Sequence, residues 1–299
     1  MTSERPRPPE PPTAPESVEV MDTGAQPFLT RSARRAARDA RPAEVELPPI
    51  AHVPRFVTVL ATVVGALLVA VAAFAGETIL ALAGLFGSLV IAWGWPRAAG
   101  LPSPKGSSAV LALTAVVTVG SVLVTDRAPY LRWTSAALAI GVIAMFVQQL
   151  LRRDGRPRLT ESVAGTSLGL VVLASGTAYL PLAHLTDGPA LIAGTMAAVA
   201  AGSGADLLVR NPAVRPWLLP LAMVVGGLAS VLVALVVGAP DVPPAALIGV
   251  TCAALAHAFR RLLSPEAGSY ASEGQIATGL ASVAVAGPLL WAIHELVVR

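Results

Sequence analysis

The sequence predicts an all-α, polytopic integral membrane protein with about nine transmembrane helices, and three observations lead to this fold class. Hydrophobic residues make up 55% of the 299 residues, charged residues make up 13%, and the mean hydropathy is +0.69. The apolar residues gather in blocks of about 20, the length of helix that crosses ~30 Å of hydrocarbon. Short stretches of one half recur in the other half. Ordinary soluble domains are less apolar and more highly charged than this chain.

Residues 1–54 are expected to form a disordered cytoplasmic tail. Proline occupies six of the ten residues from Pro6 to Pro15, and no apolar periodicity follows, so the segment cannot bury a core. Two interpretations of its arginines stay open. The first is a short basic helix against anionic headgroups or a partner, and the second is a solvated charge run that marks the cytoplasmic side. The near-helical spacing belongs to Arg31, Arg34, Arg35, Arg38 and Arg41.

Nine apolar blocks follow the tail, and each is long enough to cross a bilayer. We expect them near residues 56–75, 78–95, 108–125, 134–151, 162–182, 189–208, 217–238, 244–263 and 275–293. Tryptophans fall at the proposed ends of these spans, as in the aromatic belts of membrane interfaces. These tryptophans are Trp93, Trp95, Trp133, Trp217 and Trp291.

The loops between the spans differ in positive charge. With the tail in the cytoplasm, the outer loops contain Arg127 and Arg132, whereas the inner loops contain ten basic residues. These ten are Arg97, Lys105, Arg152, Arg153, Arg156, Arg158, Arg210, Arg215, Arg260 and Arg261. The positive-inside rule therefore predicts a plasma-membrane protein with its amino terminus inside and its carboxyl terminus outside.

An internal repeat is the most specific pattern in the chain. Ser121 to Val124 reads SVLV and recurs from Ser230 at an offset of 109, and Gly141 recurs as Gly249 at 108. Four spans separate equivalent positions, so the halves point the same way across the membrane. The predicted organisation is a leading helix at 55–77, a first four-helix repeat at 78–183 and a second at 189–299.

A stripe of small residues marks equivalent helices in the two halves. Residues four apart share one face of a helix, and small ones let a neighbouring helix approach its backbone. The two stripes are Gly194, Ala198, Gly202 and Asp206, and Gly84, Ser88, Ala92 and Pro96. Transporters built from repeats bind substrate where the halves meet, so these stripes predict a substrate pathway. A rigid bundle with closely packed glycines is the alternative.

Polar side chains inside the spans are few, and each is a candidate for function. We expect Asp206, Ser203, His257 and Gln149 to form an inward-facing cluster on the pathway, together with Gly202 and Gly194. The alternative is that Asp206 pairs with Arg210 one turn further on, while His257 lies at the headgroups beside Arg260.

The sequence predicts no enzyme, cofactor or metal site. Ser203 and His257 superficially resemble the serine and histidine pair of rhomboid proteases, but Ala201 replaces the glycine expected two residues before the serine. The histidines are scattered, and the single cysteine, Cys252, excludes a disulfide framework. The basic residues are accounted for by membrane topology, so no nucleic-acid partner is expected.

The sequence is consistent with two functions. The first is a permease-like protein that moves a small solute or lipid through the interface of the two halves. The alternative is a non-transporting scaffold or regulator whose basic tail recruits cytoplasmic or envelope partners. The lipid bilayer is the partner in either case.

Overall fold

The computed structural model describes residues 53–125, 127–152 and 158–298, and every regular element within these ranges is helical. Nine of the described helical segments are long and apolar enough to cross a membrane. The expectation of an all-α protein with nine membrane spans is therefore confirmed. The tail arginines from Arg31 to Arg41 lie outside the described residues.

The first five spans are nearly continuous α-helices. They are α2 (Phe56–Ala75), α3 (Glu77–Ala98), α4 (Pro104–Leu123), α5 (Thr134–Leu151) and α6 (Leu159–Thr177), and α6 is followed by the 3₁₀ turn η2 (Leu180–His184). Gly76 joins α2 to α3 with a φ of 111°, a conformation that favours glycine.

The last four spans are more interrupted. They are α7 (Gly188–Ser203) with η3 (Gly204–Arg210), α8 (Leu218–Val237) after η4 (Arg215–Trp217), and α9 (Val242–Leu262). The ninth consists of α10 (Ser272–Ala284), α11 (Gly287–Ile293) and the π-helical turn η6 (His294–Val298), preceded by η5 (Ala267–Tyr270). Proline lies in the first turn of α4, α7, α9 and α11, where its missing N–H breaks no helical bond.

Two helices break at corresponding places. Helix α6 ends at Thr177, four residues before Pro181, and α10 ends at Ala284, four residues before Pro288. Proline has no N–H for the carbonyl four residues earlier, so an α-helix cannot continue unchanged through it. The two helix ends are 107 residues apart in the sequence, and so are the two prolines.

The broken helices pack against each other. A Cβ on Gly176 of α6 would lie 3.4 Å from the Cβ of Ala284, and Gly287 lies close to the carbonyl of Ser175. The Tyr179 hydroxyl donates a 2.7 Å hydrogen bond to the carbonyl of Val283. Helices α6 and α10 are therefore in contact at the segments where both lose helical regularity.

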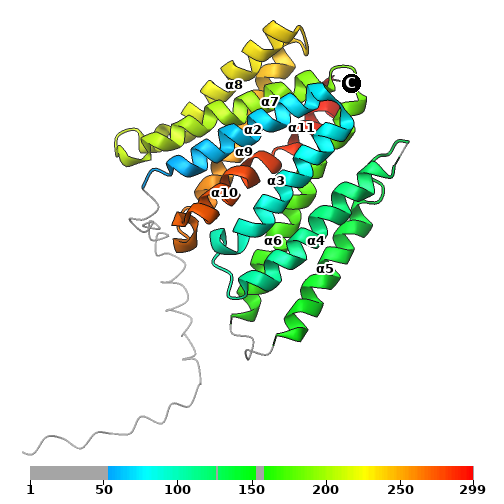
Figure 1. Cartoon of the computed structure of the whole chain (residues 1–299). Helices are drawn as coiled ribbons and strands as arrows, with labels where there is room; N and C mark the ends of the chain where they lie inside the picture. The colour runs from blue at the N-terminus through cyan, green and yellow to red at the C-terminus, as the bar shows by residue number, and fades with distance from the viewer. Residues whose placement is uncertain (1–52, 126, 153–157, 299) are drawn as a thin grey trace, which may run out of the picture. The chain divides into compact units, whose positions relative to one another are not determined.

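The leading helix α2 packs against helices of both halves. It contacts α3 of the first half and α7 and α10 of the second, and α10 also packs against α3 (Figure 1). Helices α4, α5 and α6 extend from one side of this centre, whereas α7, α8 and α9 pack together on the other. Backbones approach closely at Gly94, which lies against the Glu273 carbonyl and Ala277 of α10.

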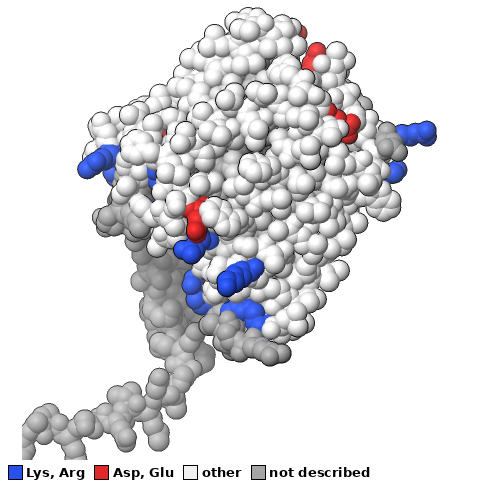
Figure 2. Space-filling model, in the orientation of Figure 1, with Lys and Arg blue, Asp and Glu red and all other residues white. Residues whose placement is uncertain are grey.

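The outer surface of the bundle is apolar. Leu60, Phe86 and Leu232 are each at least 60% exposed, as in a helix bundle whose solvent is lipid. Figure 2 shows a face that is largely free of charged side chains between the ends of the helices. The fold class is that of a multi-pass α-helical membrane protein.

Tryptophan positions correct one sequence interpretation. Trp93, Trp133 and Trp217 are more than half exposed, as side chains of an interfacial belt should be. Trp95 is fully buried, and its Nε1 donates a 2.8 Å hydrogen bond to the Gly165 carbonyl. The belt interpretation of Trp95 is wrong, because this side chain joins α3 to α6 in the core.

Candidate functional site

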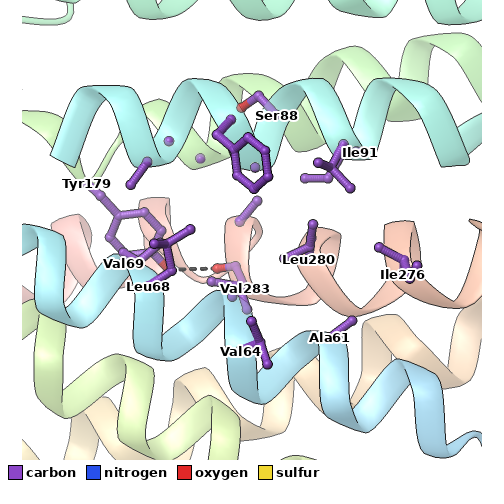
Figure 3. Close-up of a pocket in the computed structure, with 18 of the residues that line it drawn as sticks. Ala61, Val64, Leu68, Val69, Ser88, Ile91, Tyr179, Ile276, Leu280 and Val283 are labelled. Atoms are coloured by element: carbon purple, nitrogen blue, oxygen red, sulfur yellow. Dashed lines mark hydrogen bonds between the residues drawn. The ribbon is translucent and has the colours of Figure 1, made fainter. Parts of the chain in front are cut away.

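An apolar groove with a volume of about 380 Å³ lies between α2, α3 and α10. This volume falls in the range of roughly 300–1,000 Å³ typical of small-molecule sites. In Figure 3, α2 and α3 flank the groove and α10 lies between them. We call it the α2–α3–α10 groove. Its lining side chains are aliphatic or aromatic apart from Ser88 and the Tyr179 hydroxyl.

The groove runs lengthwise along α2, and therefore across the membrane. Its α2 lining begins at Val57 and ends at Val69, which at 1.5 Å per residue is about 18 Å of helix. That length exceeds half of the ~30 Å hydrocarbon thickness of a bilayer. Leu60, Val64 and Phe86 on its margins are 62%, 56% and 60% exposed, so the groove opens toward lipid.

Glycines create much of the open space. A Cβ on Gly84 or Gly87 of α3 would meet no atom within 4 Å, and both residues line the groove. One end of the groove lies at the α6 break, where Gly176, Tyr179 and Leu180 contribute to the lining. The Tyr179 hydroxyl donates to the Val283 carbonyl near the break in α10. Both polar groups therefore have a hydrogen bond within the apolar wall.

A polar cluster lies near the Arg55 end of α2. His257 Nδ1 is 2.8 Å from Asp206 Oδ1, and Arg260 Nε is 2.5 Å from Asp206 Oδ2. The three side chains are 6%, 15% and 3% exposed for His257, Asp206 and Arg260. The two carboxylate oxygens of Asp206 thus contact a histidine and an arginine.

Hydroxyl groups extend this cluster to two more helices. Arg260 Nη1 donates to Ser282 Oγ of α10 at 3.2 Å, and Thr62 Oγ1 of α2 lies 3.4 Å from the same oxygen. Thr62 also donates to the Gly279 carbonyl at 3.3 Å. The cluster therefore joins α2, η3, α9 and α10 by hydrogen bonds. The arrangement is a buried, charged network that links these elements.

A small polar pocket lies beside the cluster, with a volume of about 30 Å³. Its lining contains Arg55, Arg260, Arg261 and Asp206, so arginines outnumber carboxylates. Arg55 donates a 2.5 Å hydrogen bond to the Ser264 carbonyl and stacks over the Tyr270 ring. Burial lowers the pKa of Arg55, Tyr270 acts in the opposite direction, and the Arg261 charge lowers it further. We call this feature the arginine pocket.

The residues expected to form a polar cluster separate into three places. Asp206 and His257 are in contact, and Asp206 pairs with Arg260 rather than with Arg210. Ser203 is buried and donates to the carbonyl of Ala200 in its own helix. Ser203 and His257, which resemble a protease pair in sequence, have different partners in the structure. His257 faces Asp206, and Ser203 bonds within its own helix.

Gln149 makes its hydrogen bonds away from Asp206 and His257. It donates to Ser162 Oγ of α6 at 2.7 Å and accepts from Arg152 at 3.1 Å. Its hydrogen bonds therefore join α5 to α6 within the first half.

The stripe glycines pack within the second half. Gly194 lies against Ser230 of α8, and Gly202 lies against Ala222 of α8 and Ala253 of α9. Neither contributes to the lining of the groove or of the arginine pocket. The stripe of α7 thus brings α7, α8 and α9 together and does not face the first half.

Sequence reasoning missed three features of these sites. Arg260 was counted as a loop residue, although it is 4% exposed and lies within α9. Nothing in the spacing around Tyr179 indicates that its hydroxyl bonds to the Val283 carbonyl. The helix breaks had a signal in the sequence, because Pro181 and Pro288 follow the repeat offset closely.

No protein-family model matches the chain, and neither the curated proteins nor the solved structures contain a match. Without a match, the fold and the two sites define only the class of the protein. It is a multi-pass helical membrane protein with an apolar groove and a buried charged cluster.

Proposed function

We propose that this protein is permease-like, and that it takes up the hydrocarbon part of a lipid, or a small apolar solute, in the α2–α3–α10 groove. The observation that carries this proposal is the groove itself, which is long, apolar and open toward lipid. A polar solute would lose its hydration in the groove without finding hydrogen-bond partners, which is unfavourable. Hydrocarbon is the ligand chemistry that fits.

The position of the groove supports a role in passage across the membrane. It lies where the leading helix, the first half and the second half meet, and both broken helices contribute to its wall. Interrupted helices at the interface between repeats are a common feature of transporter sites. This argument comes from architecture and therefore concerns the class of function rather than a particular substrate.

We also propose that the bundle contains a parallel four-plus-four repeat outside α2. The breaks before Pro181 and Pro288 support it, as does the use of Gly141 and Gly249 in equivalent helices against α4 and α8. The halves have diverged in packing. Helices α7 and α9 pack directly on each other, whereas the equivalent α3 and α5 make little contact.

The proposed location is the plasma membrane with the tail in the cytoplasm. The support is the arginine and lysine bias of the loops, ten residues against two. Arg260 is buried in an ion pair and should be left out of the count. The bias remains nine against two, so the orientation does not depend on it.

Lipid scrambling in proteoliposomes tests the function. The variants Gly84→Leu and Gly87→Leu place a side chain in the groove without a backbone clash, because nothing lies within 4 Å of either Cβ position. The control is Gly120→Leu in α4, which also has open space around its Cβ position and lies outside the groove lining.

The expected result is that wild-type protein and Gly120→Leu move a fluorescent lipid or an apolar dye between leaflets, whereas Gly84→Leu and Gly87→Leu do not. Equal activity of all three variants, or no activity above empty vesicles, contradicts the proposal. The alternative scaffold function rests on the basic tail, which lies outside the described residues.

A further inference from the structure

The α2–α3–α10 groove has the width of a single hydrocarbon chain. Its volume of about 380 Å³, spread over the ~18 Å of α2 that lines it, gives a mean cross-section of about 21 Å². A methylene is close in size to a water molecule, which occupies ~30 Å³, and it lengthens an extended chain by ~1.25 Å, so one chain has a cross-section of about 24 Å². The groove therefore holds one chain and is too narrow for two chains side by side.

The same dimensions give the length of that chain. At ~1.25 Å per carbon, a groove ~18 Å long holds an extended chain of about 14 carbons. At ~30 Å³ per methylene, a volume of about 380 Å³ holds about 13 carbons. Length and volume thus agree for an alkyl chain. A compact solute of the same volume would be only about 9 Å across and would leave half of the groove's length empty.

Buried side chains close one end of the groove. Leu80, Tyr179 and Leu180 line this end and are each at most 4% exposed, and the Val283 carbonyl holds the Tyr179 hydroxyl in place. In Figure 3, Tyr179 lies at the same end of the groove as Val69. A chain that occupies the groove must stop at this wall, which we call the blind end.

The opposite end is open and borders polar groups. Ala61 and Ile276 lie at this end in Figure 3, and the exposed Val57 lies one turn of α2 further out. Glu273 precedes Ile276 by one turn of α10, and its Oε2 lies 3.3 Å from Nε of Arg97 in α3. We call this end the mouth. A lipid headgroup at the mouth would stay in polar surroundings while its chain lies among apolar side chains.

We propose that the groove binds one acyl chain of a membrane lipid, about 14 carbons long, with the end of the chain at the blind end and the headgroup at the mouth. This inference rests on the proposed uptake of hydrocarbon by the groove, and it adds the number, length and direction of the chains. The groove selects chains by length, because a longer chain must either bend out of the groove or move its headgroup away from the mouth.

Two positions at the blind end determine the length of the groove. Gly84 and Leu68 are each eight residues from Gly76, the residue that joins α2 to α3, so Gly84 lies near the Tyr179 end. Gly84→Leu fills this end with an isobutyl group without a clash, because nothing lies within 4 Å of the Cβ position. Leu180→Ala removes an isopropyl group from the closing wall. The first change shortens the groove and the second lengthens it.

The test identifies the chain length that the protein retains. The full chain in digitonin, a detergent without an acyl chain, is incubated with an equimolar mixture of lysophosphatidylcholines. Their saturated chains range from about 8 to about 18 carbons, which brackets the length of the groove. Native mass spectrometry then identifies the lipid that stays bound. Gly120→Leu is the matched control, because it adds the same side chain outside the groove lining.

The expected result is one bound lipid per protein, with a maximum near about 14 carbons in the wild-type protein and in Gly120→Leu. The maximum should move about four carbons shorter in Gly84→Leu and about three carbons longer in Leu180→Ala, as the added and removed side-chain carbons require. Gly84→Leu carries the test if Leu180→Ala cannot be purified. Binding without a preferred length, a maximum that Gly84→Leu leaves unmoved, or a dimer without bound lipid overturns the proposal.

Chain binding and transport can fail separately. Lipid scrambling by a protein that shows no preferred chain length leaves the permease-like function standing and removes this inference. A preferred length that shifts in Gly84→Leu, in a protein that does not scramble lipid, supports this inference and contradicts the permease-like function.

Discussion

The buried ion pair between Asp206 and Arg260 leads to a quantitative prediction about stability. Asp206→Asn removes the charge while it keeps the shape of the side chain, and it leaves Arg260 with 3% exposure and no anionic partner. Breaking a buried ion pair from one side typically costs about 3–5 kcal/mol. Because Asp206 retains 15% exposure, we expect the lower end of this range, about 3 kcal/mol.

A double-mutant cycle separates the pair from its surroundings. Arg260→Met should also destabilise the protein, since it leaves Asp206 with His257 alone. The combined Asp206→Asn, Arg260→Met variant should be more stable than the sum of the single effects by about 2 kcal/mol, as for other contacting pairs. The assay is unfolding in mixed micelles of a mild detergent and sodium dodecyl sulfate, followed by tryptophan fluorescence.

The control for this cycle is Asp241→Asn. Asp241 is exposed and makes no side-chain cap bond at the start of α9, so its free energy of unfolding should change by less than about 0.5 kcal/mol. A comparably small change in Asp206→Asn, or strict additivity in the double variant, would refute the reasoning from burial.

Four further variants test other parts of the protein. Tyr179→Phe removes the hydrogen bond to Val283 and should lower the free energy of unfolding by about 1 kcal/mol; no change would mean that water or lipid replaces the bond. Gly94→Ala inserts a Cβ against the Glu273 carbonyl and should destabilise by about 1–3 kcal/mol, whereas Gly120→Ala has open space and should gain up to about 1 kcal/mol; equal effects would contradict the close crossing of α3 and α10. Deletion of residues 1–46 should leave both the unfolding temperature and lipid scrambling unchanged, and loss of scrambling would instead favour the scaffold function.

The spans could be predicted from the sequence because hydrophobicity alone determines them. The predicted block at 56–75 matches α2, and that at 134–151 matches α5, residue for residue. Long apolar blocks bounded by proline, glycine and arginine leave few alternatives in a bilayer. The ends of α6 and α10 were less well predicted, because hydropathy continues through a proline break while the helix does not.

The partners of polar side chains could not be predicted in the same way. Asp206 has Arg210 one turn away in sequence, but it pairs with Arg260 across 54 residues. Local spacing identifies neighbours on one helix. It contains no information on which face of another helix approaches, and that approach decides between Arg210 and Arg260.

The small-residue stripe of α7 shows the same limit. The spacing of Gly194, Ala198 and Gly202 correctly indicated close helix packing, since Gly194 and Gly202 lie against α8. It did not indicate which helix would pack there. The open groove instead occurs at Gly84 and Gly87, where an added Cβ would meet no atom within 4 Å.

Helices α6 and α10 meet at their breaks, beside the groove. A disulfide between Gly176→Cys and Ala284→Cys, in a Cys252→Ala background, tests it most directly. The Cβ separation of 3.4 Å is close to the 3.5–4.5 Å typical of disulfides. The control pair is Gly120→Cys with Ala284→Cys. Mild oxidation in membranes should protect both thiols from a maleimide mass tag only in the first pair; two reactive thiols in both pairs would contradict the account.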